Sequence, residues 1–529
     1  MKPLSNLALL ISLVSATPLP LQNVLELELN FNLDAITTES KYTAPAPAPA
    51  KKNPLVDSDS LQALITEDDL RTGSEALWNI SQYSIPDFGH PTRVIGSKGH
   101  FKTIDYIKSE IHKLGGYYNV SVQPFDAFMS EVYNYKATID GVQPKSLVEL
   151  DSSPSTPNKD FVHGALVHVA NNGCLESDYP DEIDGGIALI QRGLCALGTK
   201  AAVSGKLGAK ATFIYNNEPG SFQGTLDVPK DGGRVVLAPS VGLSQTEGEK
   251  YAALLKSGKS LEASVLVDSY VGNITTFNVI AESVEGDPEN IVMLGAHSDS
   301  FTAGPGINDD GSGTVSQLTV AKHLTNFSLK NKVRFAWWAA EEEGGVGSTY
   351  YLEHLTPEEN QKIRLFMDYD MMASPNYEFG VYDANNEDNP AGSEELKDLY
   401  VDYYTIHGLN YDLIPLDGRS DYVAFIKNHI PGGGIATGAE GINGVNGIPF
   451  DVCYHQLCDD LDNLAYDAFL VNTKLIAHSV ATYANSLEGF PKRDYYKDGP
   501  FNGFAGVSLS SQDEPAVFTP QIKCTKVII

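Results

Sequence analysis

The sequence predicts an α/β protein with a mostly parallel central sheet flanked by helices and a smaller β-rich domain inserted into it. In the C-terminal half, short apolar runs alternate with longer amphipathic runs. The apolar runs have the length and continuous hydrophobicity of strands buried on both faces, and the amphipathic runs have helical spacing. Alternation of this kind is typical of parallel sheets covered by helices. The expected strands are 290–296, 332–340 and 364–371, and the expected helices are 311–326, 392–408 and 464–486.

The segment from 141 to 275 has a different character, which indicates a separate domain. Three short β-type runs surround an Ala/Gly-rich helical run at 196–208, and no cluster of metal-ligating residues accompanies them in the sequence. We expect this segment to be inserted between two parts of the main domain. The expected order is a signal peptide at 1–16, a pro-segment at 17–56, the main domain at 57–140 and 276–490, the inserted domain at 141–275, and a C-terminal tail at 491–529.

The N-terminus has the features of a secretory leader. Lys2 precedes the apolar run 7–14, and Ser15-Ala16 supplies small residues for cleavage. No run in the chain approaches the roughly 20 apolar residues of a membrane span. A Pro/Ala repeat at 44–50 and the basic pair Lys51-Lys52 predict a removable pro-segment, with a plain linker as the alternative. We expect a protein of the secretory pathway, and the sequence leaves secretion and delivery to a vacuole both open.

Charge and cysteine content narrow the class of protein. Lys and Arg total 37 against 68 Asp and Glu, and the net charge of −31 argues against nucleic-acid partners and anionic membrane surfaces. In an oxidising compartment the five cysteines predict two local disulfides and leave Cys524 over. Four sequons predict N-glycosylation. The expected pairs are Cys174–Cys195 and Cys453–Cys458, and the expected glycosylated residues are Asn79, Asn119, Asn273 and Asn326.

Chemistry-bearing side chains stand at or just beyond the ends of the expected strands, where sites form in open α/β sheets. Carboxylates crowded at one sheet edge cannot all ionise unless cations compensate them. Two histidines and three carboxylates suit two zinc ions that share one bridging carboxylate. Asp299 would orient the imidazole of His297 from behind. The candidates at the edge are His297, Asp309, Glu341, Glu342, Asp370 and His455.

The acidic run that begins at Glu341 has two interpretations. Alone, such a run is typical of a solvated turn. Here it follows the very apolar segment 335–340, which places it at the end of a buried strand. Consecutive side chains after a strand point in different directions, so one glutamate can bind metal while its neighbour acts as a general base.

Five motifs in order carry a family resemblance: GAHSDS, GINDDGSG, AAEEEGGVGS, DYDMMASPN and CYHQLCD. The chain resembles the M28 family of co-catalytic zinc aminopeptidases over nearly all of residues 57–490. It is most similar to the fungal branch of aminopeptidase Y and leucine aminopeptidase type, whose members carry a protease-associated insertion. The pattern GGIALIQRGLCALGTKAAVSGKLGAKATFIYNN resembles that insertion, with an anonymous α+β segment as the alternative.

The resemblance implies a role for each residue of the motifs. His297 and Asp370 would bind one zinc ion, Glu342 and His455 the other, and Asp309 would bridge them. Glu341 would be the general base for a metal-bridging water, and Tyr454 would stabilise the oxyanion. The Cys453–Cys458 pair would flank His455, although a thiolate metal site is an alternative interpretation of these cysteines. Arg419 would contact substrate. The motif that follows it departs from the family pattern Ser-Asp-His, because Tyr422 stands in the place of the histidine.

The implied activity is that of a di-zinc metallo-aminopeptidase, which removes the N-terminal residue from peptides with a free α-amino group. A glutamate-carboxypeptidase-type enzyme would need several arginines for a C-terminal carboxylate, and few stand in the C-terminal half. A non-catalytic receptor-like protein would have lost metal ligands, and a glutaminyl cyclase would lack the insertion and the complete two-metal set. A serine hydrolase is disfavoured because G-x-S-x-G is missing from the sequence. The sequence does not determine the oligomeric state, and we expect a monomer.

Overall fold

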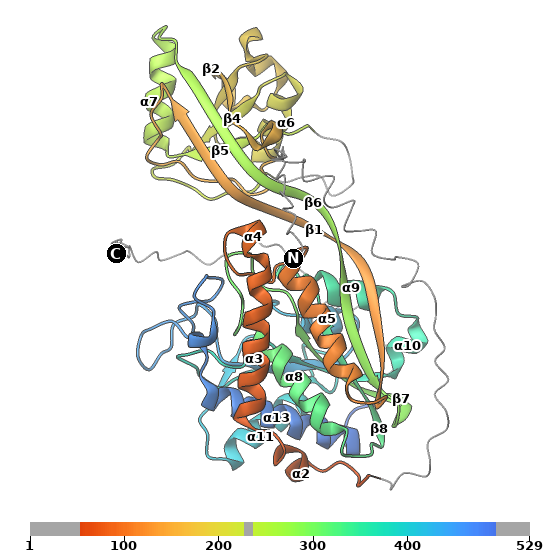
Figure 1. Cartoon of the computed structure of the whole chain (residues 1–529). Coiled ribbons are helices and arrows are strands. Elements are labelled where there is room, and N and C mark those ends of the chain that lie inside the picture. Colours follow the sequence, from red (N-terminus) through yellow and green to blue (C-terminus); the bar gives the residue numbers. More distant parts are fainter. Residues whose placement is uncertain (1–52, 227–235, 494–529) are drawn as a thin grey trace, which may run out of the picture. The chain divides into compact units, whose positions relative to one another are not determined.

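The computed structural model describes residues 53–226 and 236–493 (Figure 1). The predicted signal peptide, most of the pro-segment, most of the C-terminal tail and Cys524 lie outside these residues. Within them, no helix is both long and apolar enough to cross a membrane.

The central sheet is parallel in its middle and antiparallel towards its edges. Four neighbouring strands run parallel in the order β12-β9-β7-β8, while β6 pairs antiparallel with β8 and β10 pairs antiparallel with β12. The predicted mostly parallel sheet is therefore confirmed. The strands are β6 (Glu262–Ser283), β7 (Asp287–His297), β8 (Asn331–Trp338), β9 (Ile363–Tyr369), β10 (Gly380–Tyr382), β11 (Asp412–Ile414) and β12 (Gly432–Ala436).

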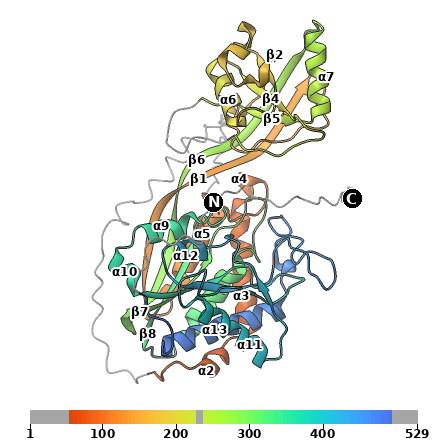
Figure 2. The same cartoon turned by 180° about the vertical axis from the view of Figure 1, so that it is seen from behind.

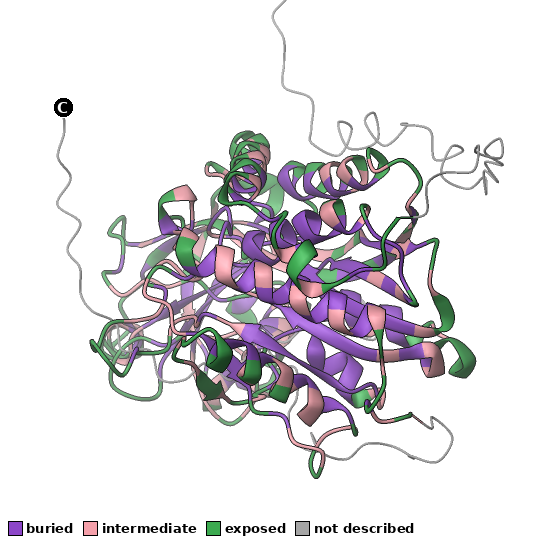
Figure 3. Ribbon diagram, turned by 90° about the horizontal axis from the view of Figure 1, so that it is seen from below, coloured by how far each residue is buried: buried purple, intermediate pink, exposed green. Residues whose placement is uncertain are grey.

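Alternate residues of the central strands enter two different cores, so both faces of the sheet are buried. Val292 and Leu294 of β7 belong to one apolar cluster, and Ile291 and Met293 belong to another. Figure 3 shows the buried strands inside a partly exposed layer of helices. The first cluster is covered by α3 (Glu67–Ser81), α5 (Lys98–His112), α8 (Gly311–Leu324), α11 (Ser393–Ile406) and α13 (Tyr466–Asn485), and the second by α9 (Val346–Glu353) and α12 (Tyr422–Lys427).

Two strands are much longer than the sequence predicts. β1 (Tyr118–Ile139) pairs antiparallel with β6 along almost its whole length, and the two run side by side in both views (Figures 1 and 2). The alternation typical of a strand extends only over 118–125 in the sequence. Pro124 and Gly272, residue types that usually interrupt strands, lie within β1 and β6. The expected domain boundary at 275/276 falls inside β6.

A second, parallel set of strands joins β6. β2 pairs antiparallel with β6, and β2, β3, β4 and β5 follow in parallel order. The Ala/Gly-rich helix predicted at 196–208 is α6 (Leu197–Lys206). The other elements are β2 (Val162–His168), β3 (Ile187–Gln191), β4 (Ala211–Tyr215), β5 (Ser240–Leu243), α2 (Ser58–Gln62), α4 (Ile85–Phe88), α7 (Gln245–Lys256) and α10 (Pro357–Lys362).

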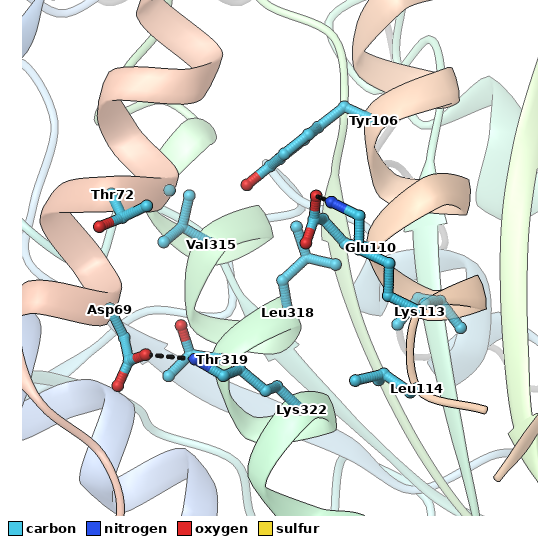
Figure 4. Close-up of a pocket in the computed structure, with 12 residues that line it drawn as sticks. Asp69, Thr72, Tyr106, Glu110, Lys113, Leu114, Val315, Leu318, Thr319 and Lys322 are labelled. Atoms are coloured by element: carbon cyan, nitrogen blue, oxygen red, sulfur yellow. Dashed lines mark hydrogen bonds and ion pairs between the residues drawn. The ribbon is translucent and has the colours of Figure 1, made fainter.

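A hollow of about 320 Å³ opens between α3, α5 and α8 (Figure 4). Val315 and Leu318 contribute apolar surface to it. Charged residues around it are paired: Lys322 Nζ lies 2.7 Å from Asp69 Oδ1, and Lys113 Nζ lies 2.5 Å from Glu110 Oε1. None of the predicted site residues lines this hollow.

Candidate active site

The predicted catalytic and metal-binding side chains meet at the C-terminal edge of the parallel strands. Three strands of the sheet, β7, β8 and β9, end at this edge and place the polar residues that terminate or follow them there, while loops bring the others. Several loops from distant parts of the chain thus converge. The residues are His297 at the end of β7, Asp309 before α8, Glu341 and Glu342 after β8, Asp370 after β9, and His455 in the turn closed by Cys453 and Cys458.

Asp309 lies at the centre of this group. Its Oδ1 atom is 3.1 Å from Nε2 of His297, and its Oδ2 atom is 3.3 Å from Nε2 of His455. One carboxylate therefore faces both imidazoles, each with a different oxygen. That is the arrangement expected of a ligand shared between two cations.

Two overlapping sets of donor atoms share Asp309. In the first set, His297 Nε2 also lies 3.7 Å from Asp370 Oδ1, a distance longer than a hydrogen bond. In the second set, His455 Nε2 lies 3.1 Å from Glu342 Oε2. Within each set the donor atoms lie within 4.8 Å of one another, close enough to surround one ion.

Buried carboxylate oxygens without a hydrogen-bond partner indicate whether cations fit the site. Among the described residues, buried oxygens Oε1 of Glu342 and Oδ1 of Asp370 have no hydrogen-bond partner. A buried carboxylate oxygen without a partner is costly, and a bound cation supplies one. Imidazole nitrogen and carboxylate oxygen are ligands that zinc accepts. The donor set therefore fits two zinc ions.

The pKa values of the clustered side chains reflect the same excess of negative charge. Burial raises the pKa of Glu341 well above its ordinary value, and the neighbouring Asp421 and Asp370 raise it further. Burial alone would lower the pKa of His455, but Glu342 and Asp309 raise it to about 10. Without cations, protons must take their place at this edge of the sheet.

Glu341 belongs to neither donor set but lies beside His297. Its Oε2 atom lies 3.9 Å from His297 Nε2, and 14% of its side chain is exposed. Its neighbour Glu342 is turned towards His455. The two adjacent glutamates thus point to different parts of the site, and their separate chemical roles stay a prediction.

Asp299 lies behind His297. Its Oδ1 atom is 3.7 Å from Nδ1 of His297, so it faces the ring nitrogen at more than hydrogen-bond distance. Its carboxylate accepts hydrogen bonds from the backbone N–H groups of Glu341 and Glu342, both at 3.4 Å. Asp299 therefore links the end of β7 to the acidic turn after β8.

Three residues of the site loops adopt the left-handed backbone conformation. They are Ala340 (φ 60°), Met371 (φ 58°) and His455 (φ 56°). For residues other than glycine this conformation costs on the order of 1–2 kcal/mol each. Ala340 precedes Glu341 and Met371 follows Asp370, so the strained positions coincide with the places where the chain presents its ligands.

Asp310 is a structural residue of the site that the sequence analysis missed. Its buried carboxylate accepts hydrogen bonds from the backbone N–H groups of His297 (3.1 Å), Gly313 (2.8 Å) and Met371 (3.1 Å). It caps α8 and ties that helix to the ends of β7 and β9. The doubled aspartate of the GINDDGSG motif was the available signal.

A second missed group fixes the loop that carries Asp309. Asp459 accepts hydrogen bonds from the backbone N–H groups of Asn308 (2.9 Å) and Asp309 (3.0 Å). Asp451 accepts one from the side-chain amide of Asn308 at 2.8 Å. Because Asp451 and Asp459 flank the turn of His455, these bonds connect the two ends of the cluster.

Arg93 is a buried cation behind the cluster. Its guanidinium donates to the carbonyl oxygens of Ser298 (2.5 Å), Pro305 (2.8 Å) and Gly306 (2.5 Å). These carbonyls belong to the loop that connects His297 to Asp309. The side chain of Arg93 therefore fixes the path of that loop and brings a positive charge near its aspartates.

Aromatic rings and Arg419 border the cluster. The rings of Tyr454 and Phe301 both stack on the ring of His455, with centroids 3.8 and 4.3 Å away. Arg419 Nη2 donates to Tyr454 Oη at 3.2 Å. Arg419 and Tyr454, predicted from the family motifs, thus contact each other beside His455.

The remaining predicted positions are the cysteine pairs and the sequons. Both predicted cysteine pairs are disulfide-bonded in the structure, Cys453–Cys458 beside His455 and Cys174–Cys195 between β2 and α6. The Cys453–Cys458 bond rules out a thiolate metal site at that turn. The sequon residues are all exposed, and glycosylation of them stays a prediction. They are Asn79, Asn119, Asn273 and Asn326.

Known proteins share this chain's sequence over most of its length. The sequence signature of "Peptidase family M28" matches residues 278–480, and that of the PA domain matches residues 162–251. Aminopeptidase Y of Saccharomyces cerevisiae is 54% identical over 449 residues, which are 84% of this chain and 83% of that protein. Probable leucine aminopeptidase 2 of Aspergillus oryzae is 42% identical over 83% of this chain and 89% of that protein.

Solved structures agree with the fold. An aminopeptidase from Aneurinibacillus sp. strain AM-1 aligns with a TM-score of 0.58 at 26% identity, over 81% of this chain and 96% of that one. BSAP, a zinc aminopeptidase from Bacillus subtilis, shares the fold with a TM-score of 0.55 at 23% identity, over 81% of this chain and 97% of that one. With a relative 54% identical over most of both proteins, the chain belongs to peptidase family M28 and is an aminopeptidase of that family.

Proposed function

We propose that this aminopeptidase uses two zinc ions to hydrolyse the N-terminal peptide bond of substrates with a free α-amino group. The observation that carries the proposal is the pair of donor sets that share Asp309. His297 and Asp370 would complete the site for one ion, and Glu342 and His455 the site for the other. When bound, zinc supplies a Lewis acid that polarises the scissile carbonyl and makes water more acidic.

Glu341 would be the general base. Its carboxylate lies 3.9 Å from His297 Nε2 of one donor set and belongs to neither set. It would accept a proton from the attacking water as the C–O bond forms and give a proton to the leaving amine as the C–N bond breaks. The hydroxyl group of Tyr454 would donate a hydrogen bond to the oxygen of the scissile carbonyl, where negative charge develops. The acidic surroundings favour a substrate that brings an ammonium group.

The positions of the arginines support an aminopeptidase over a carboxypeptidase. Arg334 is held within the sheet, where its guanidinium bonds to Glu282 and to Tyr351 Oη. Arg364 bonds to Asn290 and Pro491 instead. Of Arg334, Arg364 and Arg419, only Arg419 borders the cluster, where it contacts Tyr454. A receptor-like binding role is disfavoured because the metal ligands of both sets are present.

The cellular setting is proposed on sequence and disulfides. Two disulfides fit an oxidising compartment, and the relatives are fungal aminopeptidases. A signal peptide at 1–16 would direct the chain into the secretory pathway, and removal of a pro-segment at 17–56 would produce the mature enzyme. The destination would be the medium or a vacuole.

The proposal is tested by comparing leucine p-nitroanilide with its N-acetylated form, with and without a zinc chelator. We expect rapid cleavage of the free amine, little cleavage of the acetylated compound, and loss of activity on thorough zinc removal that added zinc restores. Equal cleavage of both compounds, or activity that survives removal of the metal, would contradict the proposed function.

A further inference from the structure

A salt bridge to Glu440 holds the guanidinium that contacts Tyr454. Arg419 Nη2 donates to Glu440 Oε2 at 2.9 Å and to Tyr454 Oη at 3.2 Å. An Nη atom of arginine carries two hydrogens, so one nitrogen can serve both oxygens. Glu440, Arg419 and Tyr454 come from three separate loops, after β12, after β11 and in the disulfide-closed turn.

The backbone on both sides of Glu440 is fixed relative to the turn of Tyr454. Asp451 N–H donates to the carbonyl of Ala439 at 2.9 Å, and Phe450 N–H donates to the carbonyl of Gly441 at 2.8 Å. The segment 439–451 therefore closes on itself just before Cys453. This arrangement keeps the Glu440 side chain on one side of Arg419 while the Tyr454 ring rests on His455.

The direction of the hydrogen bond decides where the tyrosine proton points. A phenol oxygen can accept and donate, but a guanidinium can only donate. When Arg419 donates to Tyr454 Oη, the hydroxyl proton of Tyr454 cannot point at Arg419 and is left for another acceptor. Next to the metal ligands, that acceptor would be the oxygen of the scissile carbonyl.

We propose that Glu440 is a positioning residue, which holds Arg419 against Tyr454 and thereby directs the Tyr454 hydroxyl towards the developing oxyanion. The inference rests on the proposed function, in which Tyr454 is the oxyanion donor. Arg419 would then serve Tyr454 as well as contacting substrate. The Arg419–Glu440 pair is half exposed, with 48% and 40% of the two side chains accessible, so its contribution to folding is small and its effect is on turnover.

The test is a double-mutant cycle on kcat for leucine p-nitroanilide. Tyr454→Phe should lower kcat about 100-fold or more, as removal of an oxyanion donor does. Glu440→Gln should lower kcat about tenfold with KM little changed, because the hydrogen bond that it directs forms mainly in the transition state. In the Tyr454→Phe background, Glu440→Gln should change kcat less than about twofold, because the group through which it acts is gone. Glu488→Gln, which removes another exposed carboxylate, controls for net charge.

A binding measurement separates this role from a structural one. Affinity for the phosphonic acid analogue of leucine, whose extra oxygen imitates the tetrahedral adduct, should fall with Glu440→Gln by the same factor as kcat/KM. Affinity for leucine, zinc content and thermal stability should stay within error. If Glu440→Gln fails to fold, Arg419→Lys, which keeps the charge but loses the planar fork, takes its place in the cycle.

The two hypotheses fail in different ways. A wild-type protein that does not cleave leucine p-nitroanilide would overturn the proposed function. A wild-type enzyme that cleaves it, but in which Glu440→Gln lowers kcat equally with and without the Tyr454 hydroxyl, would overturn the positioning role of Glu440 alone.

Discussion

Two acidic regions of this enzyme differ in whether nearby lysines compensate their carboxylates. At the hollow between α3, α5 and α8, each carboxylate has its own cation: Asp69 is paired with Lys322, and Glu110 with Lys113. At the C-terminal edge of the sheet, the carboxylates outnumber the imidazoles that face them, and buried oxygens of Glu342 and Asp370 have no hydrogen-bond partner among the described residues. The carboxylates of the first region are compensated by lysines of the protein, whereas we propose that bound cations compensate those of the second.

The difference shows how acidic residues that serve stability can be distinguished from those that serve a reaction. A carboxylate that caps a helix and binds a lysine has used its hydrogen-bonding capacity within the protein. A buried carboxylate that faces other carboxylates requires a ligand from outside. Substitutions at the hollow should therefore lower the stability of the protein without changing zinc content or kcat. Substitutions at the sheet edge should instead lower zinc content or kcat.

The largest effect is expected from removal of the shared ligand. Asp309→Ala takes one donor from each set, so both ions should bind more weakly. We expect kcat/KM to fall about 10³-fold or more, because several kcal/mol of charge stabilisation in the transition state are lost. Zinc content by elemental analysis and kcat/KM check this. Asp69→Ala is the matched control and should keep both. Normal zinc content in Asp309→Ala would contradict the bridging role.

Glu341→Gln should separate catalysis from metal binding. The amide cannot accept a proton but keeps the size of the side chain, so kcat should fall about 10²–10⁴-fold. Zinc content should remain that of the wild type, because Glu341 belongs to neither donor set. Glu110→Gln at the hollow should leave turnover unchanged. If Glu341→Gln lost zinc and Glu342→Gln retained it, the roles of the two glutamates would be reversed.

Asp299→Asn should have a moderate effect on zinc affinity. The substitution removes the charge behind His297 and weakens the acceptors for the N–H groups of Glu341 and Glu342. Residues that orient metal ligands typically contribute 10–100-fold to affinity, and we expect a loss in that range. Competition with a chelator of known affinity measures it. An unchanged zinc affinity would show that Asp299 does not support His297.

The smallest effect is expected at the hollow, and it is one of stability. Asp69 caps α3 and bonds Lys322, so Asp69→Asn should lower the free energy of unfolding by about 1–2 kcal/mol, with kcat and zinc content unchanged. Chemical denaturation measures it. A loss of activity at constant stability would show that Asp69 takes part in the reaction. It would contradict the difference in function between the two regions.

Asp69 also predicts how the stability of the protein changes with pH. Burial alone would raise the pKa of Asp69, but hydrogen bonds from Lys322, Thr66 and His323 lower it from 3.8 to about 2. A lowered folded-state pKa stabilises the protein above the unfolded pKa, and the contribution is lost as pH falls. The stability difference between wild type and Asp69→Asn should therefore shrink between about pH 4 and pH 2.

Much of the candidate site could be predicted because its residues follow apolar strands directly. His297, Glu341 and Asp370 each end or follow a run that can only be a buried strand, so the sheet brings them to one edge. The sequence also placed the disulfides correctly, since each pair is local. The family resemblance then supplied a role for each residue.

The unpredicted parts depend on contacts between distant segments. Arg93 bonds carbonyl oxygens 205–213 residues away, and backbone carbonyls leave no mark in a sequence. Glu440 acts through the packing of three loops. The full length of β1 and β6 was missed because long-range pairing along the two strands overrides local strand breakers.

The central claim is that a pair of cations sharing Asp309 compensates the negative charge at the edge of the sheet. Anomalous X-ray scattering at the zinc edge from crystals of the mature enzyme tests it most directly. The account predicts two peaks, one among His297, Asp309 and Asp370, and one among Asp309, Glu342 and His455. A single peak, or peaks that do not touch Asp309, would contradict it.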